Sequence, residues 1–571
     1  MKSFIKSFVP TLPWRRLATA ALGLSFIAIC VLPVTTGCRN DQNAEDDLAA
    51  TDTSGEWRER CFSFAVDNLQ RLEQFAGDQM RQKVIDRLNQ WAQYEKRPAD
   101  WEIDPLVATL PKPLVEMPEV RSLGDMTFLP YDGYALQEAV WLRDLSNWAR
   151  GPEHANLARA ESLFDWTIRN IQLAPGTGRE PDRIAQQPWE TLLWGKGTAV
   201  DRAWVFVLLL RQQGIDAVLL GLPGADKADG ENLDVWAVGV LIDGQLHLFD
   251  PALGLPIPGP KGVKYEKNRL IIPPATLSEV VKDPALLRNL DIEGHRYPVD
   301  AERLAGVVAM VEASPAYLAA RMKSVESRLV GDQQVVLTSD PSALVDRLKG
   351  VAGLADCRLW TWPYEVLLRS GQLTKEQRRQ LDLIRAPFQV GRDTYLWKGR
   401  VLHLKGVFSG VHNATYCYQQ ARPSKRNLAM IKREIAETVN PQEIAQKRGI
   451  LDALTRGKGD ATYWLGLVAL AQEKPQPEVA VDYFRMESLI GAWAQGARYN
   501  LGRIAEEAGL PNDAAVFYRT APAGPDTHGN LLRARWLVPP QQEIALPGVE
   551  ETAEPEKEKS ETPKPETEKP E

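Results

Sequence analysis

Cysteine is scarce in this sequence, which has five among its 571 residues. No two of them are spaced as a CxxC pair, so we expect no zinc ion, no iron–sulfur cluster and no other cofactor. Cys61, Cys357 and Cys417 lie well inside the chain, and one disulfide, for instance between Cys357 and Cys417, is one arrangement open to them. The other is that all three are buried thiols that pack as small apolar side chains.

The sequence also has no excess of basic residues. The formal net charge is -7, and the last 21 residues contribute eight Glu and four Lys. Proteins that bind nucleic acid usually offer a basic surface, so we expect no nucleic-acid partner. The long apolar run is confined to the first 34 residues, and no later segment reaches the roughly 20 apolar residues of a membrane-spanning helix.

The overall composition is that of an ordinary folded protein. Hydrophobic residues make up 44% of the chain and charged residues 25%, which is enough apolar surface to build cores. Because compact units usually hold roughly 100–200 residues each, we expect two or three folded units in a chain of this length.

In the first 38 residues, four basic residues precede an apolar run over 17–34, and the stretch ends in Thr35-Thr36-Gly37-Cys38. This pattern resembles a bacterial lipoprotein signal. In such signals a small residue precedes a Cys that is lipidated and becomes the new N-terminus, so the resemblance implies export and a lipid on Cys38. We expect a membrane-anchored lipoprotein or a periplasmic protein. A plain cleaved signal and an uncleaved anchor are the alternatives.

Composition and periodicity divide the chain into seven segments. Apolar residues recur at helical spacing after the leader and again near the C-terminus, whereas the final residues are mostly Pro, Glu, Lys and Thr, a composition typical of disorder. The segments are a signal over 1–38, a flexible linker over 39–56, a helical region over 57–150, a core over 155–296, a mixed α/β region over 297–425, helical repeats over 455–537 and a disordered tail over 538–571.

Local patterns predict individual elements. Two helices are expected over 57–94 and one over 157–173, and Asp243-Gly244 predicts a β-hairpin. In the mixed region, 333–339 and 399–408 look like strands, while 342–352 and 375–384 have helical spacing. The stretch 252–262 is rich in Gly and Pro, so we expect it to be a surface loop.

A 34-residue repeat occupies the last folded segment. Four residues recur at this spacing: Leu467 as Leu501, Ala471 as Ala505, Ala480 as Ala514, and Phe484 as Tyr518. This is the period of tetratricopeptide helix pairs, and the segment is similar to two such repeats, with Ala where the helices cross and an aromatic ring in the groove. Two repeats seldom bury a continuous core alone, so we expect them to pack against a neighbouring domain.

Three stretches between Leu157 and Gly262 belong together: "LFDWTIRNIQL", "GTAVDRAWVFVLLLRQQGIDAVLLG" and "DVWAVGVLIDGQLHLFDP". Together they resemble the core of the transglutaminase-like, papain-like superfamily. It implies an α+β fold in which a buried helix packs on an antiparallel sheet, flanked by the N-terminal helices and the tetratricopeptide-like repeats. In the family a Cys near the start of the helix attacks an amide carbonyl, a His on the first strand of the hairpin takes and returns the proton, and an Asp on the next strand orients the His.

The three catalytic positions of that family fall on Ala199, Asp234 and Asp250. Ala199 offers neither a nucleophile nor a proton, and Asp234 stands where the His would be. Thr198 and Asp201 predict a helix cap beside Ala199, where the helix dipole would lower the pKa of a thiol. The site therefore keeps the setting for a reactive Cys but lacks two of its three catalytic groups.

The other polar residues near these positions are better explained by structural roles than by catalytic ones. His247 precedes Asp250 by three residues, so strand alternation places it on the opposite face, unsuited to replace the missing base. Asp234 and Asp250 as an acid pair or metal site lack a third ligand, and we expect no metal. Arg202 is expected on the exposed face of its helix.

Three functions are compatible with these patterns. The first is a non-catalytic transglutaminase-like protein, exported and lipid-anchored, that binds protein or peptide partners in the cell envelope. The second is an amidase, peptidase or acyltransferase of the same fold whose nucleophile comes from elsewhere, such as Cys61 or Cys417. The third is an assembly scaffold in which the helical repeats bind and the core is a spacer.

Overall fold

The computed structural model describes residues 53–74, 77–224, 233–390 and 394–539. The described residues from Ser54 onward form one compact unit, because C-terminal helices share a core cluster with helices from the N-terminal half. The expected signal with Cys38, nearly all of the linker and nearly all of the tail lie outside the described residues. Among the described helices, none is both long and apolar enough to cross a membrane.

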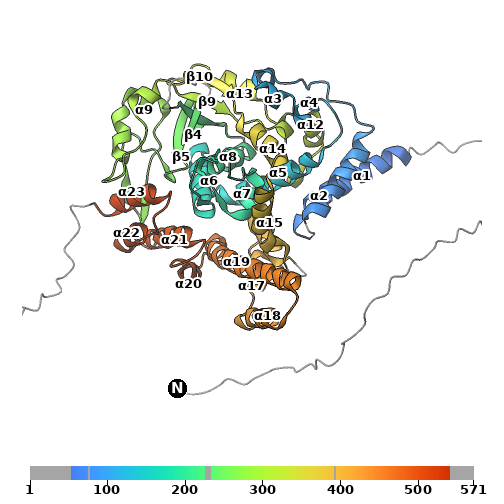
Figure 1. Ribbon diagram of the computed structural model, residues 1–571. Coiled ribbons are helices and arrows are strands. Elements are labelled where there is room, and N and C mark those ends of the chain that lie inside the picture. The colour runs from blue at the N-terminus through green and yellow to red at the C-terminus, as the bar shows by residue number, and fades with distance from the viewer. Residues whose placement is uncertain (1–52, 75–76, 225–232, 391–393, 540–571) are drawn as a thin grey trace, which may run out of the picture. The chain divides into compact units, whose positions relative to one another are not determined.

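A six-stranded sheet lies between two groups of helices (Figure 1). The strand order is β10-β9-β3-β4-β5-β6, and neighbours are antiparallel except for β9 and β10. The strands are β3 (Ala217–Pro223), β4 (Leu233–Ile242), β5 (Gln245–Asp250), β6 (Leu255–Pro256), β9 (Val308–Val311) and β10 (Asp356–Leu359). With the surrounding helices, the described chain is an α+β structure, as the sequence predicted.

Helix α8 (Ala199–Gln212) packs on one face of this sheet. All its residues from Asp201 to Leu210 are buried, because α5 (Pro130–Ala149), α6 (Asn156–Asn170) and α7 (Pro188–Trp194) cover the sides of the helix that the sheet does not. The helix ends at Gln212, two residues before Gly214. Gly214 has a φ of 66°, which glycine adopts at no steric cost because it has no Cβ. The helix predicted around residue 199 is confirmed, and the one predicted over 157–173 is confirmed as far as Asn170, after which residues 172–173 form a strand.

The opposite face of the sheet carries a second, smaller core cluster. Its apolar side chains come from the sheet and from α9 (Leu277–Lys282), η3 (Pro284–Leu290), α10 (Ala301–Leu304) and α13 (Pro341–Leu348). The hairpin between β4 and β5 is confirmed, with Asp243 and Gly244 both at positive φ in its turn. The expected surface loop over 252–262 is wrong in part, because it contains β6 and buries Leu255 and Ile257 against this cluster.

The N-terminal helical region begins with the two predicted helices, α1 (Thr53–Leu69) and α2 (Gly77–Ala92). Helix α1 starts at Thr53, three residues before the expected end of the linker at residue 56. The short helices of this region are η1 (Leu72–Gln74), η2 (Pro105–Thr109), α3 (Lys112–Val115) and α4 (Pro118–Arg121). Two further two-stranded sheets lie later in the chain: β1 (Gln172–Leu173) with β2 (Lys196–Gly197), and β7 (Lys264–Glu266) with β8 (Arg269–Ile271).

The mixed region is more helical than predicted. The helices expected over 342–352 and 375–384 are confirmed as α13 and α15 (Lys375–Gln389), but 333–339 is not a strand. The predicted strand over 399–408 is wrong, because these residues belong mainly to α16 (Tyr395–Leu404), which is buried on nearly all sides. The other helices here are α11 (Pro315–Leu318), α12 (Ala320–Glu326), η4 (Gly331–Gln333), α14 (Trp362–Gly371), α17 (Ala414–Gln420) and α18 (Lys425–Glu437).

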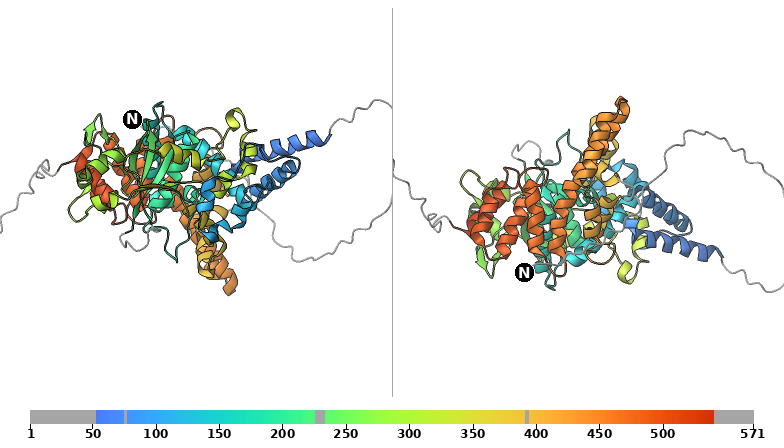
Figure 2. Two further views of the ribbon diagram at one scale, coloured as in Figure 1. Left: turned by 90° about the horizontal axis from the view of Figure 1, so that it is seen from above. Right: turned by 90° about the horizontal axis from the view of Figure 1, so that it is seen from below.

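The C-terminal helices form two successive pairs followed by a single helix. They are α19 (Pro441–Ala471) with α20 (Pro477–Glu487), α21 (Ala494–Glu507) with α22 (Pro511–Arg519), and α23 (Thr527–Leu537). As expected, they pack against a neighbouring part of the chain: Arg503 pairs with Asp165 of α6, and the Tyr463 hydroxyl donates to the Arg169 carbonyl. Helix α18 and the first half of α19 extend away from the other helices (Figure 2), and α18 has no buried residue.

Helix α23 closes over the turn that follows β5. Gly529 lies so near the Leu253 carbonyl that a Cβ would collide with it. The His528 imidazole N–H donates to the Leu290 carbonyl at 2.7 Å, and Arg535 donates to the Asp291 carbonyl at 2.6 Å. The last described helix is therefore bonded to chain that precedes it by more than 200 residues.

Gly502→Ala is expected to destabilise the protein, because a Cβ at Gly502 would lie 2.5 Å from the ring of Tyr518, where α21 crosses α22. Tyr518 is buried and its hydroxyl donates to Glu506, so the ring has little room to move. Overpacking of this kind costs roughly 1–3 kcal/mol, only partly offset by the ~1 kcal/mol helix preference of Ala. Gly449→Ala, at an exposed position of α19 with no neighbour in reach, should instead gain about 0.5–1 kcal/mol. Urea denaturation of both variants measures the contrast, and equal effects would refute the crossing as the cause.

Candidate functional site

The first turn of α8 has the predicted cap. The Thr198 Oγ1 accepts from the Asp201 N–H at 3.2 Å, and Asp201 Oδ2 accepts from the Thr198 N–H at 2.8 Å. Both side chains are buried, whereas Ala199 is half-buried at the first position of the helix. The capped helix start that would lower the pKa of a thiol is thus present, but the residue there is Ala199, which has no thiol.

Arg202 is buried, and its expected place on an exposed helix face is wrong. Only 4% of the residue is exposed. Its guanidinium donates to the carbonyls of Ile171 at 2.8 Å and Pro251 at 3.1 Å. Burial lowers the pKa of Arg202 to about 10, so the side chain remains charged at neutral pH. A buried guanidinium whose N–H groups bond to backbone carbonyls is structural, and here it links the end of α6 to the turn after β5.

Asp250 also has a structural role. Its Oδ2 accepts from the Tyr297 hydroxyl at 2.7 Å, and its Oδ1 accepts from the N–H groups of Ala252 and Leu253 at 2.8 and 3.0 Å. The Tyr297 oxygen in turn accepts from the Trp236 indole at 2.7 Å. Burial raises the pKa of Asp250 above its usual value. The carboxylate closes the turn after β5 and holds Tyr297.

Asp234 lies elsewhere and is exposed. It forms an ion pair with Arg303 at 2.7 Å, and 66% of its side chain is accessible to solvent. Tyr297 and Leu304 belong to the cluster on the face of the sheet away from α8. Both carboxylates therefore bond to the segment 297–303, and none of their described hydrogen bonds reaches Ala199. The pairing of β3 with β4 shifts register between Leu220 and Gly221. Such a shift changes which face of the sheet the following side chains occupy, and the spacing of residues in the sequence does not reveal it.

The other candidates from the sequence are not assembled into a site. His247 is half-buried on β5 opposite Val240 and is not bonded to Asp250, and burial lowers its pKa. Within the described ranges there is no group of three or more His, Cys, Asp and Glu side chains placed to hold a metal ion. Asp234 and Asp250 thus have no third ligand beside them.

The three described cysteines are free thiols. Cys61 is buried, with its Sγ 3.5 Å from Gln90 Oε1. Burial raises the pKa of both Cys357 and Cys417. A catalytic thiol needs the opposite shift, since the thiolate is the nucleophile. No disulfide joins Cys357 to Cys417.

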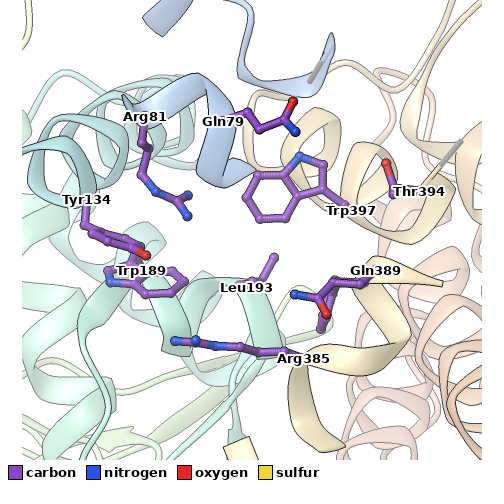
Figure 3. A pocket seen from close by; sticks show the side chains of 10 residues that line it. Gln79, Arg81, Tyr134, Trp189, Leu193, Arg385, Gln389, Thr394 and Trp397 are labelled. Atoms are coloured by element: carbon purple, nitrogen blue, oxygen red, sulfur yellow. The ribbon is translucent and has the colours of Figure 1, made fainter. Parts of the chain in front are cut away.

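A cavity of about 350 Å³ opens among five helices, one of which is α7 (Figure 3). Its walls come from α2, α5, α7, α15 and α16, so none of the sheet contributes. The lining residues are Gln79, Arg81, Tyr134, Trp189, Leu193, Arg385, Phe388, Gln389, Thr394 and Trp397. A smaller cavity of about 180 Å³ lies at the C-terminal end of α8, and neither cavity includes Ala199, Asp234 or Asp250.

Aromatic rings and guanidinium groups dominate this cavity. The rings of Tyr134 and Trp189 stack with centroids 4.9 Å apart. The Arg81 guanidinium lies 4.0 Å from the Tyr134 centroid and donates to Gln137 at 2.7 Å. The Arg385 guanidinium lies 5.8 Å from the Trp189 centroid and pairs with Glu190 at 3.1 Å. In Figure 3 the two guanidiniums lie on opposite sides of the opening.

Sequence reasoning missed this cavity because its residues are spread over more than 300 positions. Gln79 and Trp397 meet only through the packing of α2 against α5 and of α16 beside them. No local motif marks any of the five helices as part of a site.

Comparison with known protein families, with curated proteins and with solved structures finds no match for this chain.

Proposed function

We propose that this chain is an exported, lipid-anchored binding protein built on a transglutaminase-like core that has lost its chemistry, with tetratricopeptide-like repeats at its C-terminus. Its partners are proteins or peptides of the cell envelope. The order of α8, β3 and the β4–β5 hairpin matches that of the transglutaminase-like core, and two helix pairs follow at the 34-residue period. The lipoprotein-type signal ending in Cys38 supports the export and the anchor.

The observation that carries the proposal is Ala199 at the capped start of α8. Acyl transfer of this kind needs a nucleophile there, a base beside it and a group to orient the base. Ala199 has no nucleophilic atom, Asp234 is paired with Arg303, and Asp250 is bonded to Tyr297 and two backbone N–H groups. Each of the three positions therefore lacks a free catalytic group.

A relocated nucleophile is the alternative, and the surroundings of the thiols argue against it. Cys61 and Cys417 are buried, and the pKa of Cys417 is raised. Neither thiol lies at the first turn of α8, and a thiol held in its neutral form is a poor nucleophile. A binding role requires none of these groups to react.

Thiol labelling of the mature protein tests the proposal. A fluorescent iodoacetamide at neutral pH should label no cysteine of the folded protein stoichiometrically within minutes, whereas all three should react in urea. Cys357 is half-buried on β10, so Cys357→Ser serves as the matched control for slow surface reaction. Rapid stoichiometric labelling that is lost in Cys61→Ser or Cys417→Ser, together with ammonia release from a glutaminyl peptide, would overturn the proposal in favour of an enzyme.

A further inference from the structure

We propose that the cavity of about 350 Å³ among α2, α5, α7, α15 and α16 is a binding site for an uncharged aromatic ring with a carbonyl group beside it. The ring belongs to a small molecule or to a side chain of a peptide. The first turn of α8 and the three degenerate catalytic positions are not part of the lining. The site therefore goes beyond the proposed function and does not depend on whether the core is catalytic.

Two tryptophan rings line the cavity from different helices. Trp189 of α7 stacks on Tyr134 with ring centroids 4.9 Å apart. Trp397 of α16 packs against Trp141 with ring centroids 5.6 Å apart. In the described part of the chain the Trp189 and Trp397 rings make no contact with each other, and Figure 3 shows them on different sides of the opening. Each ring is thus held by a neighbouring ring, and the cavity lies between the two.

The apolar lining favours a flat aromatic group over an aliphatic group of equal size. Phe388 and Leu193 complete the apolar surface, and only 7% and 4% of these two residues are exposed. Aromatic rings prefer stacked or edge-to-face ring partners, which an aliphatic group does not supply. The volume lies at the small end of the range for ligand pockets, so one ring with a short substituent fits better than a larger ligand.

The protein itself supplies partners for the charged groups of the lining. Arg385 pairs with Glu190 at 3.1 Å. Arg81 donates to Gln137 at 2.7 Å, and its guanidinium lies 4.0 Å from the centroid of the Tyr134 ring. A ligand is therefore not needed to balance charge, and a charged ligand would lose part of its hydration on entering the cavity. These contacts favour an uncharged ligand.

One polar group of the lining favours a hydrogen-bond acceptor on the ligand. The Trp397 indole N–H is buried and has no acceptor in the described part of the chain, unlike every other side-chain polar atom of the ten lining residues that is buried to this degree. A buried donor without an acceptor costs free energy, which a bound acceptor recovers. In Figure 3 the nitrogen of the Trp397 ring lies on the side of Gln79. A neutral carbonyl oxygen beside the bound ring is the acceptor that suits this position.

Titration calorimetry of the full mature chain with three probes tests the ligand class. N-acetylphenylalanine amide carries the ring and its carbonyl groups, the cyclohexylalanine analogue replaces the flat ring by an aliphatic one, and N-acetylphenylalanine adds a negative charge. The aromatic amide should bind with a Kd of about 1 mM or below, the strength usual for a ligand of this size. It should bind about 2- to 12-fold more tightly than the cyclohexyl analogue, and the acid should bind no more tightly than the amide.

Three results of these titrations would overturn the proposal. The first is no saturable binding of the aromatic amide up to about 10 mM. The second is equal or tighter binding of the cyclohexyl analogue, which would show that the cavity does not select for a flat ring. The third is tighter binding of the acid, which would show that the cavity selects for charge.

Leu193→Phe separates binding from folding. In Figure 3 the end of the Leu193 side chain points into the opening, so a phenyl ring at this position occupies the space that the ligand needs. The variant should bind the aromatic amide at least about tenfold more weakly and keep the wild-type urea midpoint, because the added atoms enter unfilled space. Leu489→Phe, the same change at a residue that is 74% exposed and outside the lining, should alter neither. Unchanged affinity in Leu193→Phe, or a lower urea midpoint, would contradict an open cavity.

The source of the ring is settled by a fourth probe. An N-acetyl-Ala-Ala-Phe-Ala-Ala amide that binds more tightly than N-acetylphenylalanine amide identifies a peptide side chain, and equal or weaker binding identifies a small aromatic molecule. Both results support an aromatic site. Because thiol labelling reports on the core and these titrations report on the cavity, the two proposals fail independently.

Discussion

Replacement of Arg321 by methionine is expected to lower the free energy of unfolding by about 3–5 kcal/mol. The Arg321 guanidinium donates through two N–H groups to both oxygens of Asp132, at 2.6 and 3.0 Å, and both side chains are fully buried. This pair joins α12 to the start of α5. Without the arginine, the Asp132 carboxylate remains in the core with no cation beside it. Urea denaturation at neutral pH measures the loss.

The chain supplies a matched control for this prediction. Arg347 binds both oxygens of Asp216 at the same two distances, 2.6 and 3.0 Å, but 50% and 34% of the two side chains are exposed. Exposed ion pairs are worth about 0–1 kcal/mol, so Arg347→Met should have little effect. If the two variants lose the same stability, burial is not what makes the Arg321 pair important.

Glu138→Gln is expected to stabilise the protein at alkaline pH. Burial, reinforced by the nearby negative charge of Glu312, raises the pKa of Glu138 to about 8, even though its carboxyl group accepts from the Trp189 N–H at 3.0 Å. The folded protein keeps this proton up to about pH 8, while the unfolded chain releases it near 4.5. The wild-type protein therefore loses stability as pH rises from about 5 to 8.

The glutamine side chain removes this pH dependence but keeps an oxygen for the Trp189 N–H. The gain in free energy of unfolding should be about 2–4 kcal/mol at pH 8 and close to zero at pH 4.5. Urea denaturation at both pH values measures it, with Glu434→Gln, exposed on α18, as the control. A gain of equal size at both pH values would show that the carboxyl proton is not the cause.

Local sequence rules predicted the elements that local physics determines. The Thr198–Asp201 cap, the Asp243-Gly244 turn and the 34-residue spacing of α19 to α22 each depend on residues near one another in the chain. The failures have tertiary causes. Residues 399–408 look like a strand, yet they are mainly helical because Arg400 finds a buried acceptor in the Leu192 carbonyl and the apolar residues around it are covered on several sides. Arg202 was expected at the surface, and two distant carbonyls allow its burial.

The candidate sites show the same limit. The position of Ala199 at a helix start follows from sequence, but the contacts of Asp234 and Asp250 depend on the register shift in β3 and β4 and on Tyr297 and Arg303. The cavity of about 350 Å³ depends on residues from five helices and has no sequence signature. The sequence therefore predicted the main elements of the core, whereas the bonding partners of individual side chains are determined by the whole fold.

Helix α23 has a consequence for how the chain is made. It is the last described element to leave the ribosome, yet it covers the turn after β5 and is bonded to the carbonyls of Leu290 and Asp291. Until α23 has been synthesised, Leu532 is missing from the smaller core cluster and the turn after β5 is uncovered, so the nascent chain exposes part of its core. Chains that end before Thr527 should therefore be held by chaperones or degraded.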